Sequence, residues 1–291
     1  MIVSYNCRDL VSACIASLHQ AGAVRKRWRI WLVDNASTDG TVSAVKARFD
    51  GVTVLGRASN DGFGVANNIA LRQCTAPFVL VLNPDTKVAE GVIDHLLGQL
   101  RGWPDVAVVG CRLEQADGSL DLAAKRRFPT PRSALQYFFS RRRTLAEYSN
   151  PEVAPEEVGD VDAVNGAFML VRAEAIGEVG LFDEDYWMYA EDLDWCKRFW
   201  DAGWRIRYDG RVSVLHLKSA VSGKRRSPRL NWHFHHSMAI YYRKHHAGSS
   251  WPLDALVHVG IYARLAQKTL TDGGATLISR MTRPATDRTQ A

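Results

Sequence analysis

The chain has 291 residues, of which 46% are hydrophobic and 23% are charged, and this globular composition excludes a largely disordered protein. It leaves enough apolar material for one large domain, or for one domain with an appendage. The net charge of +6 favours anionic partners, such as nucleotides, diphosphates, anionic lipids or nucleic acid. Five scattered cysteines without a C-x-x-C pair indicate reduced thiols in a cytoplasmic protein. Because no apolar run reaches about 20 residues, we expect no membrane-spanning segment.

The first 113 residues alternate short β-rich runs with helical patterns, which is typical of a mainly parallel sheet flanked by helices. The predicted strands span residues 2–5, 30–33, 52–55, 78–82 and 106–111. The predicted helices lie between them, at residues 9–21, 41–49, 65–74 and 90–102. The run NASTDGT, residues 35–41, supplies capping residues before the second helix. We therefore expect an α/β fold whose ligands bind beyond the carboxyl ends of the strands.

The pattern changes near residue 114. Residues 114–160 form a basic segment that we expect to be a mobile insertion, since 125–160 is rich in Arg, Pro, Ser and Glu. Regular patterns then return, with extended runs at 161–172, 204–210 and 212–217 and helices at 191–203, 229–246 and 252–268. Basic clumps at 125–127, 141–143 and 224–226 are either solvated loop charge or contacts for an anionic partner.

Polar residues follow each of the first four predicted strands. They are Tyr5 and Asn6, Asp34, the run RASNDGFGVANN at 57–68, and the run LNPDT at 82–86. Asp34 is either a helix-capping or loop acid, or an acceptor for the imide N–H of a pyrimidine base that stacks on Tyr5. The glycines of NDGFG form either a plain turn or a close approach of backbone to a ligand. Four polar strand ends in succession favour a ligand site.

The strand end LVLNPDT offers one carboxylate for a metal ion. Asp85 lies on the ligand edge of the predicted strand, and one carboxylate with phosphate oxygens and water is how Mg²⁺ is usually held. Pro84 fixes the turn and removes a backbone donor. A purely structural Asx turn at Asn83 is the alternative.

The stretch FDEDYWMYAEDLDWCKRFW, residues 182–200, combines acids with aromatic rings. A helix is predicted from about Glu191, and acids in its first turn complement the helix dipole, which accounts for Glu191 and Asp194. Asp183 and Glu184 belong to a preceding turn, so the dipole does not account for them. His216, on an alternating strand, is either a hydrogen-bonded core residue or a ligand.

These motifs, in this order, resemble the family 2 inverting glycosyltransferases, in particular a rhamnosyltransferase-like branch. The matching runs are VSYNCRDLVSACIASL, VDNASTDGT, NDGFGVANNIAL, VLVLNPDT, NGAFMLVRAEAIGEVGLFDEDYWMYAEDLDWCKR and VLHLKS, within residues 2–246. The resemblance implies a GT-A fold with a nucleotide-sugar-binding half at 1–113, the insertion at 114–160, a catalytic and acceptor half at 161–246, and a C-terminal helix with a disordered tail at 247–291. The first strand is shorter than is usual in the family, so we expect related chains to start further upstream.

The resemblance also assigns roles to single residues. Tyr5 and Asp34 match base-binding positions, and Asn83-Pro84-Asp85 matches the D-x-D motif, with Asn83 in place of its first aspartate. Asp192 matches the catalytic base, with Glu191 as its neighbour, and His216 matches a histidine that ligates the metal or the diphosphate. The expected cofactor is Mg²⁺ or Mn²⁺, held by Asp85 and His216. Further donor contacts are expected from Asn6, Asn60, Gly62 and Asn67. Acceptor or sugar contacts are expected from Gly166, Asp183, Glu184, Trp187 and Tyr189.

The implied activity is transfer of a sugar, with L-rhamnose from dTDP-rhamnose the favoured donor, to a glycan or polyprenyl-diphosphate-linked glycan of the cell envelope. A UDP-hexose or UDP-galactofuranose donor stays open. A nucleotidyltransferase would need a glycine-rich loop after the first strand, and SYNCRDL has no glycine. A non-catalytic carbohydrate-binding protein would explain the aromatic residues, but it would not need Asp34, Asp85 and Asp192 at the ends of strands and helices. We expect no nucleic-acid partner, and we expect a cytoplasmic protein. The segment 251–268 is either an ordinary core-packing helix or a peripheral contact with the anionic inner face of the plasma membrane.

Overall fold

The computed structural model describes residues 1–130, 149–217, 226–248 and 250–281. The described residues fall into two compact units. Residues 1–129 and 149–217 belong to the first unit, and residues 226–248 and 250–281 belong to the second. The first unit contains every site residue predicted from the sequence.

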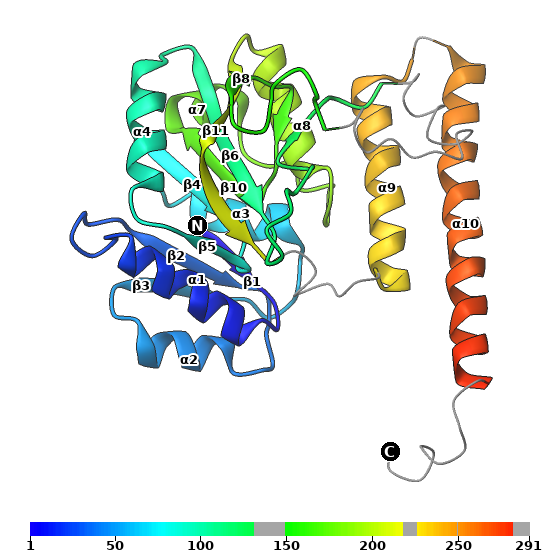
Figure 1. The fold of residues 1–291 in the computed structure, drawn as a ribbon. Coiled ribbons are helices and arrows are strands. Elements are labelled where there is room, and N and C mark those ends of the chain that lie inside the picture. Colours follow the sequence, from blue (N-terminus) through cyan, green and yellow to red (C-terminus); the bar gives the residue numbers. More distant parts are fainter. Residues whose placement is uncertain (131–148, 218–225, 249, 282–291) are drawn as a thin grey trace. The chain divides into compact units, whose positions relative to one another are not determined.

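The first unit is built on one large mixed sheet with helices around it (Figure 1). Its strands are β1 Ile2–Ser4, β2 Ile30–Asp34, β3 Val52–Gly56, β4 Phe78–Leu82, β5 Thr86–Val88, β6 Val106–Glu114, β10 Phe168–Arg172 and β11 Arg205–His216, with β8 Val158–Asp160 paired to β11. The order across the sheet is β3-β2-β1-β4-β10-β6-β11-β5. Strands β3, β2, β1 and β4 are mutually parallel, and β11 is parallel to β6. The predicted α/β fold with a mainly parallel sheet is confirmed.

One strand of this sheet runs against its neighbours. β10 is antiparallel to β4 on one side and to β6 on the other, with Phe168 opposite Leu82. All five of its residues are buried or half-buried, so it closes the centre of the sheet rather than an edge. This insertion places the chain just before Phe168 next to the carboxyl end of β4, where ligands of such sheets bind.

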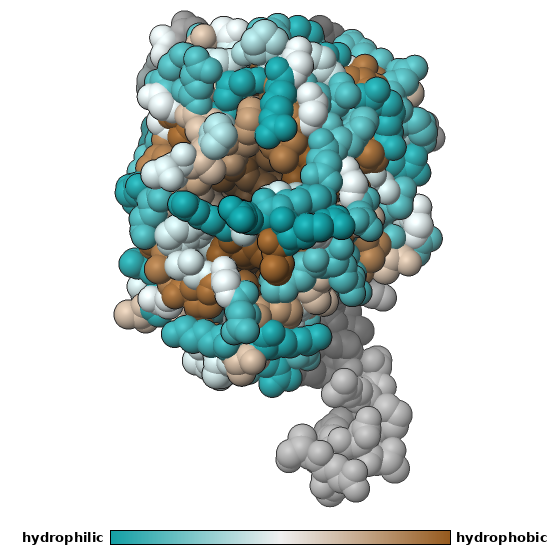
Figure 2. Space-filling model, turned by 90° about the vertical axis from the view of Figure 1, so that its left-hand side faces the viewer, coloured by the Kyte–Doolittle hydropathy of each residue, from teal (hydrophilic) through white to brown (hydrophobic). Residues whose placement is uncertain are grey.

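The helices of the first unit are α1 Arg8–Gln20, α2 Thr41–Arg48, α3 Phe63–Leu71, α4 Val92–Gly102, α7 Ala173–Val179 and α8 Glu191–Asp201. The first four agree with the predicted helices to within two or three residues at each end. The N-cap of α2 is Gly40, which has no side chain to cap the helix. The preceding residue, Asp39, accepts a hydrogen bond from the Thr41 amide through its carboxylate. Figure 2 shows one side of the molecule, on which hydrophilic residues dominate and hydrophobic ones lie mostly in hollows.

The sequence patterns missed several short elements. β5, β8 and β7 Lys125–Arg126 are two or three residues long, too short for a period-2 pattern. β7 pairs with β9 Ala163–Val164, and β9 and β10 both lie within the extended run predicted at 161–172. The two strands predicted at 204–210 and 212–217 form the single strand β11, which shifts its register against β6 between Asp209 and Ser213. That irregularity explains why the pattern appeared interrupted at Gly210.

The basic segment 114–160 is only partly described. The clump at 125–127 lies in it, and solvated loop charge is wrong for two of its three residues: Lys125 and Arg126 are 9% and 6% exposed. The Lys125 ammonium donates to the carbonyls of Asn150 and Val153, which is why it tolerates burial. The aromatic cluster at 137–139, the clump at 141–143, most of the clump at 224–226 and the tail at 282–291 lie outside the described residues.

The second unit contains α9 Pro228–His245 and α10 Trp251–Met281. Val257 and Ile261 of α10 are buried together with Ala239 and Tyr242 of α9, which form the core of the pair. Within the described part of the chain, no helix has the length and apolar character needed to cross a lipid bilayer. All five cysteine thiols are free, as predicted for reduced cysteines.

Candidate active site

The ends of β1 and β2 hold a buried carboxylate beside an exposed ring. Asp34 is 2% exposed, and its side chain accepts hydrogen bonds from the Ser4 hydroxyl at 2.8 Å and from the Ser37 amide at 2.9 Å. Tyr5, next to Ser4, is 46% exposed. Asn6 has a positive φ of 47°, and its side-chain oxygen accepts from the Thr38 amide at 2.8 Å, which ties the two strand ends together. An exposed ring next to a fixed acceptor suits a planar base.

The glycine loop packs directly against the loop that precedes α8. Gly62 has φ +96°, and a Cβ atom there would lie 2.1 Å from the carbonyl oxygen of Trp187. That carbonyl accepts from the Phe63 amide at 2.9 Å, and the Trp187 indole donates to the Asn60 carbonyl at 3.2 Å. Only glycine allows this approach. Gly62 therefore joins the predicted donor-binding and acceptor-binding loops by backbone contact.

Three further predicted residues lie in or beside α3. The Glu184 carboxylate accepts from the side-chain amide of Asn68 at 2.9 Å and from Arg72 at 2.8 Å, and these bonds lower its pKa. Asn67 is 1% exposed and donates to the Phe63 carbonyl at 3.0 Å. Asp183 caps its own turn by accepting from the Asp185 amide at 3.0 Å. These three residues shape the loops around the site.

Asp85, just after β4, and His216, at the end of β11, lie next to each other. His216 Nε2 is 3.5 Å from Asp85 Oδ1, longer than an ordinary hydrogen bond, and the Leu217 amide donates to the Asp85 carbonyl at 2.8 Å. The opposite ring nitrogen, Nδ1, is 3.1 Å from a carboxylate oxygen of Asp121. Burial lowers the pKa of His216, but the hydrogen bond to Asp121 and the Asp85 carboxylate outweigh burial and raise it to about 9.

This pair fits a divalent cation. Asp85 Oδ1 is buried and has no hydrogen-bond partner among the residues that the structure describes, an arrangement that is costly unless something binds there. Adjacent ligand atoms of an octahedral cation with bonds of about 2.1 Å lie roughly 3 Å apart, close to the separation of Asp85 and His216. No group of three potential ligands occurs in the described residues. The remaining positions would fall to water and diphosphate oxygens, as Mg²⁺ sites commonly require.

Asp192 lies in the first turn of α8 and accepts hydrogen bonds from three residues. Its Oδ2 accepts from Arg126 Nη2 at 2.7 Å and from the Gly166 amide at 2.9 Å, and its Oδ1 accepts from the Leu193 amide at 2.8 Å. The helix starts without a side-chain cap, after Tyr189 and Ala190 with φ of 72° and 64°. Two successive residues in the left-handed region are strained, and such strain often marks functional sites.

Glu191, beside Asp192, is 7% exposed, and its Oε2 atom has no hydrogen-bond partner within the described part of the chain. Burial, together with the charge of Asp192, raises the pKa of Glu191 to about 8. Asp194 instead pairs with Arg198 at 2.8 Å, so it is structural. The three acids of one helical turn therefore differ in their partners.

Backbone contacts bring the Asn83–Asp85 turn and Asp192 together. The Asn83 amide donates to the carbonyl of Ala167 at 3.1 Å, and the adjacent Gly166 amide donates to Asp192 at 2.9 Å. The antiparallel strand β10 makes this possible, because it delivers Gly166 and Ala167 to the end of β4. A base on one side and a cation site on the other is an arrangement suited to group transfer from a diphosphate.

Asp121 and Arg126, which contact His216 and Asp192, were not predicted from the sequence. Arg126 belongs to the basic clump at 125–127, but a clump does not indicate which of its members is buried. Asp121 carried no signal, since an acid after a turn is usually solvated. Asp121 contacts His216 across 95 residues of chain, and Arg126 contacts Asp192 across 66.

Known proteins resemble this chain in sequence. Residues 1–180 match the model of Glycosyl transferase family 2. The chain is 33% identical over 235 residues to the N-acetylglucosaminyl-diphospho-decaprenol L-rhamnosyltransferase of Mycobacterium tuberculosis, covering 75% of this chain and 76% of the relative. It is 26% identical over 193 residues to the rhamnosyltransferase WbbL of Escherichia coli, covering 63% and 71%.

Solved structures share the fold. The mannosyltransferase PcManGT of Pyrobaculum calidifontis superposes with a TM-score of 0.57 at 19% identity, covering 95% of this chain and 78% of that one. TarS of S. aureus, residues 1–349, superposes with a TM-score of 0.55 at 14% identity, covering 89% and 69%. From the matching family model, the rhamnosyltransferase relatives and the GT-A fold, we conclude that this chain belongs to the family 2 glycosyltransferases and is rhamnosyltransferase-like.

Proposed function

We propose that the protein transfers L-rhamnose from dTDP-rhamnose, with inversion, to a hydroxyl group of a polyprenyl-diphosphate-linked glycan in cell-envelope synthesis. Its relatives' names support this donor sugar and this class of acceptor. The observation that carries the proposal is the position of the Asp192 carboxylate. It accepts from the Gly166 amide, and the next residue, Ala167, accepts from the Asn83 amide in the Asn83–Asp85 turn. A fixed carboxylate next to a cation site is what direct displacement at a sugar carbon needs.

The chemistry follows from the acceptor. A sugar hydroxyl has a pKa far above neutral, so a base must take its proton as the oxygen bonds to C1 of the donor sugar. Asp192 takes that proton while the bond from C1 to the diphosphate oxygen breaks on the opposite face, which inverts the anomeric centre. Asp192 is the carboxylate that we assign as the base, because Arg126 and the Gly166 amide hold it in place, whereas burial and the charge of Asp192 raise the pKa of Glu191 to about 8.

The nucleoside diphosphate leaves with negative charge. Asp85 and His216 would hold a divalent cation, which when bound offsets that charge. PcManGT was solved with Mn²⁺, which supports a cation of this kind. Tyr5 and Asp34 would bind the base of the nucleotide, by stacking and by accepting its imide N–H. Trp187 and Tyr189 would line the sugar pocket.

A donor panel tests the proposal. Purified protein is incubated with dTDP-rhamnose, UDP-glucose, UDP-galactose and UDP-galactofuranose, with Mn²⁺ and a short polyprenyl-diphosphate-GlcNAc acceptor. We expect acceptor-dependent release of dTDP with dTDP-rhamnose, and NMR of the product should show the anomeric configuration opposite to that of the donor. Turnover with a UDP-sugar alone would move the proposal to that donor. Retained configuration would overturn the inverting mechanism.

We also propose that α10 brings the protein to the membrane that holds such an acceptor. Apolar residues of α10 outside the core that it shares with α9 are exposed, namely Trp251, Leu256, Val259 and Leu270. Aromatic and aliphatic side chains on one helix face favour binding at a lipid interface. Flotation with anionic vesicles should recover the wild-type protein and lose a Trp251→Ser/Val259→Ser variant. Equal recovery of both proteins would contradict membrane contact through α10.

A further inference from the structure

His216 lies between two buried carboxylates that contact opposite nitrogens of its ring. Asp121 Oδ2 is 3.1 Å from Nδ1, and Asp85 Oδ1 is 3.5 Å from Nε2. The side chains of Asp121 and His216 are 1% and 7% exposed, so water does not compete for this contact. The shorter distance belongs to Asp121, the residue on the side away from the proposed cation.

The orientation of the Asp121 carboxylate is fixed by its own backbone surroundings. Its Oδ1 accepts from the Ala123 amide at 3.0 Å, which leaves Oδ2 toward His216. The Asp121 amide donates to the Leu113 carbonyl at 2.9 Å, so β6 holds the backbone of this residue as well. An ionised carboxylate only accepts hydrogen bonds, and the imidazole must therefore donate to it from Nδ1.

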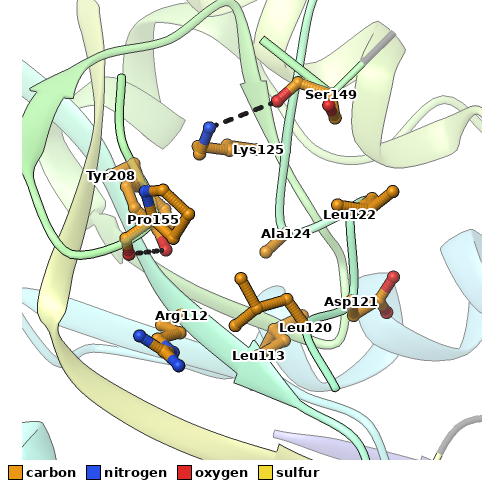
Figure 3. A pocket seen from close by; sticks show the side chains of 10 residues that line it. All are labelled: Arg112, Leu113, Leu120, Asp121, Leu122, Ala124, Lys125, Ser149, Pro155 and Tyr208. Atoms are coloured by element: carbon orange, nitrogen blue, oxygen red, sulfur yellow. Dashed lines mark hydrogen bonds between the residues drawn. The ribbon is translucent and has the colours of Figure 1, made fainter. Parts of the chain in front are cut away.

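The segment that carries Asp121 is packed into the first unit. Figure 3 shows a small cavity there, whose walls come from β6, β11 and the chain around Asp121 and Lys125. Lys125 donates to the Ser149 carbonyl and the Asp121 amide donates to the Leu113 carbonyl, and both bonds tie this segment to its neighbours. A carboxylate on a segment held at both ends can orient a side chain that it contacts.

We propose that Asp121 is a positioning residue that holds His216 in the tautomer with hydrogen on Nδ1, so that the Nε2 lone pair faces a divalent cation beside Asp85. The inference rests on the proposed cation site and extends it to a residue with no ligand contact of its own. Histidine ligands of metals usually donate their other ring N–H to a carboxylate or carbonyl, and loss of that partner typically weakens metal binding about 10- to 100-fold.

The substitution Asp121→Asn provides a nearly isosteric test. Because the Ala123 amide requires an acceptor at Oδ1, the asparagine would turn its NH₂ group toward His216 and favour hydrogen on Nε2, where the cation should bind. The control is Asp117→Asn in the same loop. Asp117 is exposed and accepts only from Ser119 among the described residues.

The first measurement is the affinity for Mn²⁺ in the presence of dTDP, from the EPR signal of free Mn²⁺. We expect D121N to bind Mn²⁺ about 10- to 100-fold more weakly than wild type, and D117N to match wild type. Equal affinity of D121N and wild type would overturn the inference and leave the cation site standing. Wild-type protein that binds no Mn²⁺ would overturn both.

The second measurement needs no variant at position 121. ¹⁵N NMR of histidine-labelled wild-type protein with Mg²⁺ and dTDP reports which ring nitrogen of His216 carries hydrogen, with His216→Asn used only for assignment. We expect hydrogen on Nδ1 and an unprotonated Nε2. Hydrogen on Nε2 in the Mg²⁺-loaded protein would overturn the inference, even if D121N does not fold.

Discussion

Arg126 Nη2 lies 2.7 Å from Asp192 Oδ2, and this ion pair is buried, with 7% and 10% of the two side chains exposed. Arg126 also donates to the Val164 carbonyl at 2.6 Å, which fixes the guanidinium between β9 and the start of α8. The candidate base is therefore held by a cation from a segment that lies 66 residues earlier in the chain. Stability and activity should both depend on this pair.

Replacing Arg126 by Met should destabilise the protein by about 3 kcal/mol or more, because it leaves the Asp192 charge buried without its partner. The double variant Arg126→Met/Asp192→Asn should recover part of this loss, since no uncompensated charge remains. Urea unfolding of the wild type, both single variants and the double variant gives the coupling energy directly.

The exposed pair of Arg127 and Glu152 provides the control. Their side chains are 42% and 75% exposed, so Arg127→Met should change the free energy of unfolding by less than about 1 kcal/mol. If Arg126→Met cost no more than Arg127→Met, the buried pair would have no special role.

Asp192→Asn should lower kcat by about 10²- to 10⁴-fold, the usual contribution of a general base, while dTDP-rhamnose binding survives. Asparagine keeps the shape of the side chain but cannot take the acceptor proton. Rapid-quench turnover and isothermal titration with the donor separate the two effects. The control is Asp201→Asn at the exposed end of the same helix, where Asp201 pairs with Lys197. Turnover of D192N near the wild-type rate would remove Asp192 as the base.

Gly62→Ala should destabilise the protein and also impair donor binding. The new Cβ would lie 2.1 Å from the Trp187 carbonyl oxygen, and φ of +96° is unfavourable for alanine. Gly98→Ala is the matched control, since a Cβ at this exposed position within α4 meets nothing within 4 Å. It should stabilise the protein by about 0.5–1 kcal/mol. Thermal unfolding measures the stability of both variants, and equal melting temperatures of Gly62→Ala and wild type would contradict the close approach at Gly62.

Glu191 should make the protein less stable as the pH rises from about 4.5 to about 8. In this window the folded protein keeps a proton on Glu191 that the unfolded chain has already lost, because the pKa is about 8 in the fold and 4.5 otherwise. Glu191→Gln should remove this component. The measurement is the difference in unfolding free energy between wild type and E191Q across the window. A difference that stays constant with pH would show that Glu191 titrates normally.

Much of the first unit could be predicted because its signals are local. β4 Phe78–Leu82 matched its predicted bounds, and α1 to α4 appeared where amphipathic patterns placed them. Asp34 and Asp85 could be singled out because each stands where a predicted strand ends, whereas Asp192 was assigned through the resemblance of its motif to the family. Residues at such points are marked by a change of pattern along the chain, which is visible without any knowledge of tertiary contacts.

Short elements and distant partners had no such signal. β10 lies antiparallel between β4 and β6, an arrangement that hydrophobic pattern does not specify, since a buried strand has the same pattern in either direction. Glu184 was predicted to contact the acceptor, and the structure adds two partners that the pattern did not predict, since its carboxylate accepts from the Asn68 side chain and from Arg72. The role of a charged side chain depends on which partner the fold supplies.

Local pattern alone was enough for the class of fold, the order of its motifs and the acids at the ends of its elements, because each depends on residues a few positions apart. Only the tertiary structure brought Arg126 to Asp192 and Asp121 to His216, across 66 and 95 residues of chain. Burial then decided the charge state of Glu191 and the partners of the other two acids in its turn. Electrostatic interactions in a buried site depend on distance in space, and the linear sequence does not contain that distance.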